Sequence, residues 1–160
     1  MPQSQQEAEL VQNMLGQLGV RVEIQVVPGG DFFEQYVRPG QFDFTVFSWI
    51  GSPFPISSVQ SLYAVPTTGA DGQLDIQQNY ARIGSQEIDR LFAEATAELD
   101  RARALELANQ IDALIWQEVH SLTLYQRPEI IATRSGLANF GAFAFEQPAT
   151  YQDIGWVSAP

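Results

Sequence analysis

Two apolar segments separated by a short helical pattern constrain the fold of this 160-residue chain most strongly. The first segment, 20–27, alternates valine or isoleucine with polar residues at period two, which is typical of a strand with one covered face. The second segment, 42–49, is aromatic and β-branched on both faces, which suits a strand buried on both sides. Between them, Asp31 and Glu34 have the spacing of a capping box that opens a short helix. Strand, helix and strand in this order predict a βαβ unit with parallel strands and a right-handed crossover.

Helical periodicity adds a first helix over 4–18 and a helical hairpin over 86–118. Ser85 and Asp100 stand where they can cap the two helices of the hairpin. We therefore predict an α/β fold, a layered, mainly parallel sheet with flanking helices. The apolar positions assigned to the hairpin are Ile88, Leu91, Phe92, Ala95 and Leu99 in its first helix, and Leu107, Ile111, Leu114 and Ile115 in its second.

Charge and composition exclude several classes of function. The chain has 19 acidic residues, 8 basic residues and a net charge of -11, with no cluster of arginines, so it repels nucleic acid. It contains no cysteine, which excludes disulfides, thiolate metal sites and thiol nucleophiles. It also contains no lysine, so no phosphate-binding P-loop can be completed. We expect no cofactor and no metal site.

His120 is the only histidine and the only candidate for a catalytic relay. Glu118 or Asp112 could orient it toward a serine nucleophile, but no serine stands in a GxSxG elbow. A structural, hydrogen-bonded histidine is the commoner outcome at such a position. We expect a protein that is not an enzyme, with a small hydrolase that uses His120 as the alternative.

The irregular connection 51–84 interrupts the regular pattern between the second strand and the hairpin. Its prolines and glycines give no strand or helix beyond a short helical candidate at 58–63. Connections of this length are commonly functional or mobile. A second alternative is therefore a stand-alone or regulatory interaction module that uses this loop as its contact surface.

Several pieces of the sequence, in this order and spacing, resemble the second lobe of a known family. The family is that of the extracytoplasmic solute-binding proteins of peptide-type ABC transporters, the oligopeptide- and dipeptide-binding family 5. The resemblance covers nearly the whole chain. The pieces that carry it are residues 18–19, 20–23, 33–36, 40–44 with Trp49, 79–83, 85–91 and 122–128.

This resemblance implies a periplasmic-binding-protein-like lobe of type II and a binding function. In such proteins two lobes close on a ligand, so residues 1–135 would be the C-terminal lobe and residues 136–160 a tail that crosses back to the first lobe. The implied partners are a small solute, peptide or glycolipid-like, and an ABC transporter permease. The implied location is extracytoplasmic, periplasmic or lipid-anchored at the cell surface as a lipoprotein, although this chain carries no signal sequence.

The resemblance also implies a ligand-binding site at the carboxyl end of the second strand, where open α/β sheets bind ligands. In the resembled peptide binders, an aspartate three residues after the tryptophan meets the ligand's amino group, whereas this chain has Ser52 after Trp49. A neutral hydroxyl cannot make the charge-assisted bond that anchors an ammonium group. The implied ligand-binding residues are Trp49, Ile50, Gly51, Ser52, Tyr125 and Arg127.

Aromatic residues of the tail would lack their natural partner surface if a first lobe is missing. Exposed apolar area favours burial against a second copy of the chain, so we expect either a homodimer of the fragment or a protease-sensitive tail. The residues concerned are Phe140, Phe143, Phe145, Tyr151 and Trp156.

Overall fold

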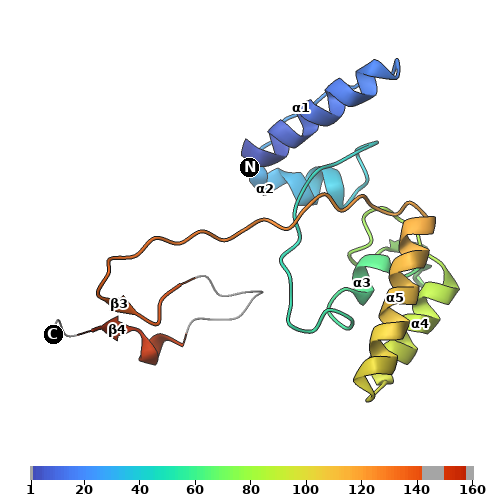
Figure 1. Ribbon diagram of the computed structural model, residues 1–160. Coiled ribbons are helices and arrows are strands. Elements are labelled where there is room, and N and C mark those ends of the chain that lie inside the picture. Colours follow the sequence, from blue (N-terminus) through green and yellow to red (C-terminus); the bar gives the residue numbers. More distant parts are fainter. Residues whose placement is uncertain (1, 142–149, 158–160) are drawn as a thin grey trace. The chain divides into compact units, whose positions relative to one another are not determined.

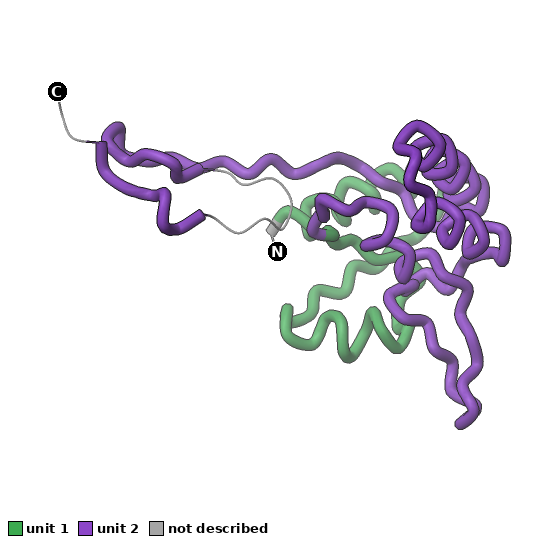
Figure 2. The backbone as a smooth tube through the Cα atoms, turned by 90° about the horizontal axis from the view of Figure 1, so that it is seen from below, with its two compact units in different colours: residues 1–49 green, residues 50–160 purple. Residues whose placement is uncertain are grey.

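The structure of the chain is a computed structural model that describes residues 2–141 and 150–157 (Figure 1). It consists of two compact units, Met1–Trp49 and Ile50–Pro160 (Figure 2).

The first unit begins with helix α1 (Pro2–Gln17), which confirms the helix predicted over 4–18. Gly19 ends it with a φ of +80°, a left-handed conformation that glycine adopts without strain. The N–H of Gly19 donates to the carbonyl of Gly16, and the N–H of Val20 donates to that of Leu15, both at 3.0 Å. This pair of hydrogen bonds is a Schellman motif, which satisfies carbonyls at the end of the helix.

The short helix predicted after residue 30 is present as α2 (Gly29–Asp31) followed by a π-helical turn, η1 (Phe32–Val37). The capping box predicted at its start is wrong. Asp31 lies inside the helical turn with φ -90° and ψ -20°, and its side chain makes no capping bond. The helix has its N-cap at Pro28, three residues earlier than the predicted cap, so the carboxylate is not at the cap position. Val37, 1% exposed, is the buried residue of η1.

The parallel sheet predicted from 20–27 and 42–49 is not confirmed, because neither segment forms a strand in the described part of the chain. The ladders that are described are antiparallel and short. They join β1 (Thr67–Thr68) to β2 (Leu74–Asp75), and β3 (Leu137–Ala138) to β4 (Gly155–Trp156). Alternating side chains indicate which face of a strand is covered, but a ladder also needs a partner backbone. Neither 20–27 nor 42–49 has such a partner among the described residues.

The second unit is built around a helical hairpin of α4 (Gln86–Ala97) and α5 (Arg101–Gln117), preceded by the short helix α3 (Gln60–Tyr63). Both predicted caps are confirmed. The Ser85 hydroxyl accepts from the N–H of Ile88 at 3.3 Å, and the Asp100 carboxylate accepts from the N–H of Arg103 at 2.8 Å. Both bonds satisfy orphan donors at a helix start.

The hairpin's core consists of the apolar faces that the sequence predicts. Partly buried Ile56, Val59, Tyr63 and Leu114 extend it. Leu99 is an exception, because α4 ends at Ala97 and leaves this side chain 98% exposed in the connection to α5. The buried residues of the core are Ile88, Leu91, Phe92, Ala95, Leu107, Ile111 and Ile115.

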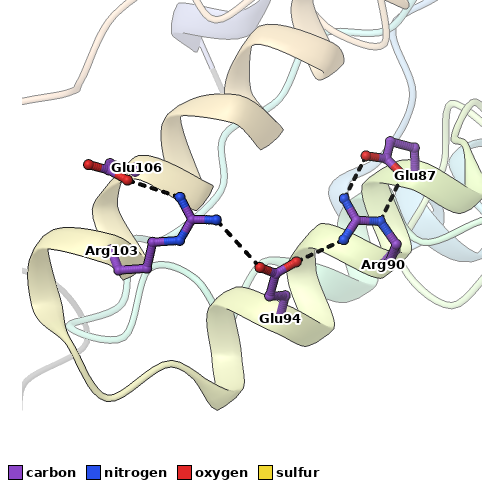
Figure 3. A network of polar contacts seen from close by, with 5 residues as sticks. All are labelled: Glu87, Arg90, Glu94, Arg103 and Glu106. Atoms are coloured by element: carbon purple, nitrogen blue, oxygen red, sulfur yellow. Dashed lines mark hydrogen bonds and ion pairs between the residues drawn. The ribbon is translucent and has the colours of Figure 1, made fainter.

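A chain of ion pairs runs along the outside of the hairpin (Figure 3). Arg90 on α4 pairs with Glu87 at 2.7 Å and with Glu94 at 2.8 Å. Glu94 also meets Arg103 of α5 at 3.6 Å, and Arg103 pairs with Glu106 at 3.0 Å. The network therefore links the two helices, although its members are exposed and screened by solvent.

Among the residues that the structure describes, no helix combines the length and the apolar character needed to cross a membrane.

Candidate functional site

Trp49 ends the first unit as the outermost member of an aromatic cluster. Its ring lies edge-on to Phe47, with centroids 5.4 Å apart. Phe47 in turn contacts Phe33 at 5.4 Å and Phe32 at 6.3 Å, again edge to face. Edge-to-face contacts of this kind stabilise aromatic pairs beyond their buried area. Trp49 is nevertheless 49% exposed, so part of its ring is open to other contacts.

The next three predicted residues, Ile50, Gly51 and Ser52, begin the second unit. Ile50 is 76% exposed and Gly51 is exposed, whereas Ser52 is half-buried. The Ser52 hydroxyl oxygen accepts a hydrogen bond from the N–H of Phe54 at 3.2 Å. The hydroxyl is thus held in a local turn and is neutral, as the sequence indicates.

Tyr125 and Arg127 lie in the segment that follows α5. Tyr125 is 55% exposed and Arg127 is half-buried. Trp49 belongs to one unit, and these two residues belong to the other. Their assembly into one ligand site therefore stays a prediction.

A buried polar cluster around Asn79 lies beside the hairpin and was not singled out by sequence reasoning. Asn79 is fully buried, and its Nδ2 donates to the carbonyls of Ala64 at 2.8 Å and Ile83 at 2.7 Å. Its Oδ1 lies 3.0 Å from Nε2 of His120. The residues around Asn79 contributed to the family resemblance, but an asparagine in a polar stretch gives no sequence signal of burial.

The environment of His120 favours the neutral form of its imidazole. Burial lowers the pKa of His120 below its ordinary value, and the charge of Glu118 and a nearby backbone group of Leu62 only partly oppose this effect. The Tyr63 ring packs against the imidazole with centroids 4.7 Å apart. Burial raises the pKa of Tyr63, and a hydrogen bond to the Ser121 side chain acts in the opposite direction.

This environment gives no support to the hydrolase alternative. A serine activated by His120 would need a basic ring nitrogen, but Nε2 is already hydrogen-bonded to Asn79. Nδ1 is buried and has no hydrogen-bond partner in the described residues, so neither Glu118 nor Asp112 orients the ring as a triad carboxylate does. The contacts of His120 are those of the structural histidine that the sequence favours.

Two further contacts hold the backbone beside this cluster. The carboxylate of Asp89 on α4 accepts from the N–H of Val65 at 3.3 and 3.4 Å. A Cβ added to Gly84 would lie 2.8 Å from the carbonyl oxygen of Tyr63. Glycine is therefore required where these two backbone segments approach each other.

The tail predicted to cross to another lobe is described in part. Phe140, Tyr151 and Trp156 are 43%, 74% and 67% exposed, while Phe143 and Phe145 lie outside the described residues. Asn139, Phe140, Gly141, Thr150 and Asp153 line an open hollow of about 530 Å3, which contains none of the predicted ligand-binding residues.

In the described ranges, no group of three or more histidine or acidic side chains is arranged to hold a metal ion.

Comparison with known proteins gives one strong similarity. The chain is 45% identical over 139 residues, 87% of its length, to the oligopeptide-binding protein OppA of Mycobacterium bovis and of two strains of Mycobacterium tuberculosis. The chain covers 22% of the length of these relatives. No protein-family model matches the chain. The resemblance to peptide-type solute-binding proteins predicted from the sequence is thus confirmed.

Proposed function

We propose that this chain, which is similar over most of its length to oligopeptide-binding proteins, is a ligand-binding lobe of an extracytoplasmic solute-binding protein of an ABC transporter. The observation that carries the proposal is the 45% identity over 139 residues. Because the chain covers 22% of its relatives, it acts in this proposal as part of a longer protein. Residues 1–135 are then its C-terminal lobe, and residues 136–160 cross back to the first lobe.

The proposal includes a periplasmic-binding-protein-like fold for the lobe. In it, 20–27 and 42–49 become neighbouring strands once the remaining partner segments are present. Val20 and Val26 support this proposal, because they belong to the alternating apolar pattern of a strand and yet are 49% and 69% exposed. An apolar strand face that is exposed in this chain would be covered by a partner segment.

Peptide is the ligand class we propose. Trp49 offers a half-exposed ring next to the backbone of Ile50 and Gly51, which a peptide in extended conformation could pair with. Ser52 supplies no negative charge for a ligand's ammonium group, a bond worth about 1.5–3 kcal/mol. The site should therefore favour peptides with a blocked amino terminus, and glycolipid-like solutes are the competing ligand class.

Tyr125 and Arg127 are the other two side chains that we propose contact the solute. Tyrosine combines an apolar ring with a hydroxyl, and arginine can bind a carboxylate through two parallel hydrogen bonds. With Trp49 they provide one stacking surface, one polar aromatic group and one cation. These groups bind a solute and perform no chemistry, so the proposed protein is not an enzyme.

The proposed partners are the peptide and the permease of the transporter. The proposed location of the protein itself is outside the cytoplasmic membrane. A lipid anchor at the cell surface and a homodimer of the isolated chain are finer parts of the same proposal. Sedimentation of the 160-residue chain tests the dimer, because a strict monomer at all concentrations contradicts it.

Titration calorimetry tests the binding function. The probes are penta-alanine with a free amino terminus and the same peptide after acetylation. The longer protein should bind the acetylated form more tightly, while the 160-residue chain alone should bind with a Kd of about 1 mM or weaker, since half of the contacts are missing. Tight, stoichiometric binding to the isolated chain contradicts the two-lobe proposal.

Tryptophan variants give a matched control for the site. Trp49→Ala should abolish most of the binding in the longer protein, whereas Trp116→Ala, at a similarly exposed position on α5, should leave it unchanged. Ser52→Asp should improve binding of the free-amino-terminal peptide about tenfold or more, because it restores a charge-assisted bond. Equal effects of the two tryptophan variants, or no effect of Ser52→Asp, refute the assigned site.

A further inference from the structure

The hydrogen bonds of Asn79 determine which nitrogen of His120 carries the proton. Both N–H groups of the Asn79 amide are used, one on the carbonyl of Ala64 and one on that of Ile83. The atom that faces His120 is therefore Oδ1, which can only accept. Nε2 of His120 must donate, so the neutral ring is the Nε2–H tautomer.

A strained turn places His120 against Asn79. Val119 follows the C-cap of α5 with a φ of +51°, a left-handed conformation that β-branched residues rarely adopt. Its N–H donates to the carbonyl of Trp116 at 3.2 Å, and the N–H of His120 donates to that of Ile115 at 3.4 Å. This turn directs the imidazole to a residue that lies 41 positions earlier in the chain.

Other groups around the imidazole hold the same stretch of backbone. Tyr63 packs on the ring, and the Ser121 side chain hydrogen-bonds to Tyr63. The charged groups nearby are Glu118, which acts on His120, and Asp112 of α5, which acts on Tyr63. Residues 120 and 121 therefore both contact the cluster around Asn79 and Tyr63. The segment that carries Tyr125 and Arg127 begins directly after them.

We propose that His120 is a positioning residue: its hydrogen bond to Asn79 fixes the direction in which residues 121–127 leave the hairpin and so places Tyr125 and Arg127. What these two residues bind rests on the proposed function. The positioning itself rests on the described contacts of His120 alone.

The tautomer gives a direct spectroscopic test on the unmodified chain. Because His120 is the only histidine, its imidazole signals in a long-range nitrogen–proton NMR spectrum need no assignment. The signals should show a neutral ring protonated at Nε2. A ring protonated at Nδ1 at neutral pH would overturn the proposal, because Nε2 could then not donate to Asn79.

Two variants test the positioning. His120→Leu removes the donor, whereas His120→Gln keeps an N–H donor on a side chain of similar reach. Hydrogen exchange of the Val119 and His120 amides, which are hydrogen-bonded in the turn after α5, should accelerate about tenfold or more in His120→Leu, with less change in the core of α4 and α5, and return toward the original rate in His120→Gln. The backbone NMR chemical shifts of residues 121–127 should also change in His120→Leu and return toward their original values in His120→Gln. Uniform acceleration across the hairpin and the turn, with unchanged shifts at 121–127, would indicate a merely structural role and overturn the proposal.

A measurement of peptide binding separates this inference from the proposed function. In the longer protein, His120→Leu should weaken binding of acetylated penta-alanine, and His120→Gln should restore it. If exchange at Val119 and His120 and the chemical shifts of 121–127 respond as expected but the unmodified protein binds no peptide, the proposed function fails and the positioning stands. If the unmodified protein binds peptide and His120→Leu alters neither exchange nor affinity, the positioning fails and the function stands.

Discussion

The α4–α5 hairpin and the predicted strands at 20–27 and 42–49 have equally clear apolar patterns, but only the hairpin buries its pattern. Ile88 and Leu107 are each 1% exposed in the hairpin, whereas Val26 is 69% exposed in the first predicted strand. The pattern alone therefore does not decide whether a segment is buried.

The difference lies in where each segment finds its partners. Helical hydrogen bonds are made within each helix, and a connection of residues 98–100 brings the faces of α4 and α5 together. A strand must instead find a second backbone, which in a parallel sheet lies beyond a crossover. The hairpin contains both helices that bury its apolar pattern, whereas neither predicted strand has a partner strand among the described residues.

The largest expected effect is in the hairpin core. Leu107→Ala should lower the free energy of unfolding by about 2–5 kcal/mol, because it removes a buried side chain and leaves a cavity. Leu105→Ala, at a 61% exposed position on the same helix, should change it by less than about 0.5 kcal/mol. Urea unfolding followed by far-UV circular dichroism measures both. Equal effects would show that the two faces of α5 are not distinguished as described.

A glycine pair tests the tight backbone approach beside the hairpin. Gly84→Ala should destabilise by about 1–3 kcal/mol, because the added carbon would meet the Tyr63 carbonyl. Gly16→Ala in α1, where nothing lies within 4 Å, should instead stabilise its helix by about 0.5–1 kcal/mol. Urea unfolding of both variants measures these changes in the free energy of unfolding. An unchanged free energy in Gly84→Ala would contradict the close approach of the two backbone segments.

The turns that follow α1 at Gly19 and α5 at Val119 both have a left-handed residue, so glycine and valine can be exchanged between them. Val119→Gly should stabilise the chain by about 0.5–1 kcal/mol, because relief of the left-handed strain, about 1–2 kcal/mol, exceeds the added chain entropy of glycine. Gly19→Val should destabilise α1 for the same reason. Thermal unfolding should raise the Tm of the first variant and lower that of the second. A lower Tm for Val119→Gly would mean that the valine side chain contributes more than its exposed position indicates.

A smaller effect is expected from pH. The pKa of His120 is lowered in the folded state, so the unfolded chain binds the proton more readily. The resulting stability is fully present above the ordinary histidine pKa of 6.5 and is lost as the pH falls through the folded pKa. Unfolding free energies measured between about pH 7.5 and 5 should decline less in His120→Gln than in the unmodified chain. Parallel pH profiles would contradict the buried, neutral imidazole.

The smallest effect is expected from the surface ion pairs. Arg90→Gln should lower the Tm slightly at low salt and not detectably in about 1 M NaCl, because its partners Glu87 and Glu94 are exposed and screened. Differential scanning calorimetry at both salt concentrations measures this. A large decrease that persists at high salt would show that the network stabilises the hairpin more than its exposure implies.

The sequence predicted those parts of the fold that neighbouring residues determine. The helix at 4–18, the caps Ser85 and Asp100, and the core of the hairpin follow from spacing and from side-chain chemistry. The capping box at Asp31 and the burial of Leu99 were wrong because each depends on which residue begins or ends a helix, and periodicity determines such boundaries poorly.

The candidate site was predictable only as far as the resemblance reaches. Trp49, Ser52, Tyr125 and Arg127 follow from matched sequence pieces, but their assembly depends on contacts between distant parts of the chain. Asn79 was missed because its buried amide is held by hydrogen bonds to the carbonyls of Ala64 and Ile83, and no local sequence pattern indicates such contacts.

Hydrogen exchange on the 160-residue chain, read peptide by peptide, tests most directly whether the hairpin is complete in itself and the predicted strands are not. The amides of α4 and α5 should be strongly protected, while those of 20–27 and 42–49 should exchange at nearly the rate of unstructured chain. Protection of 20–27 and 42–49 equal to that of the hairpin would contradict this account, because it would show that the predicted sheet forms within these residues.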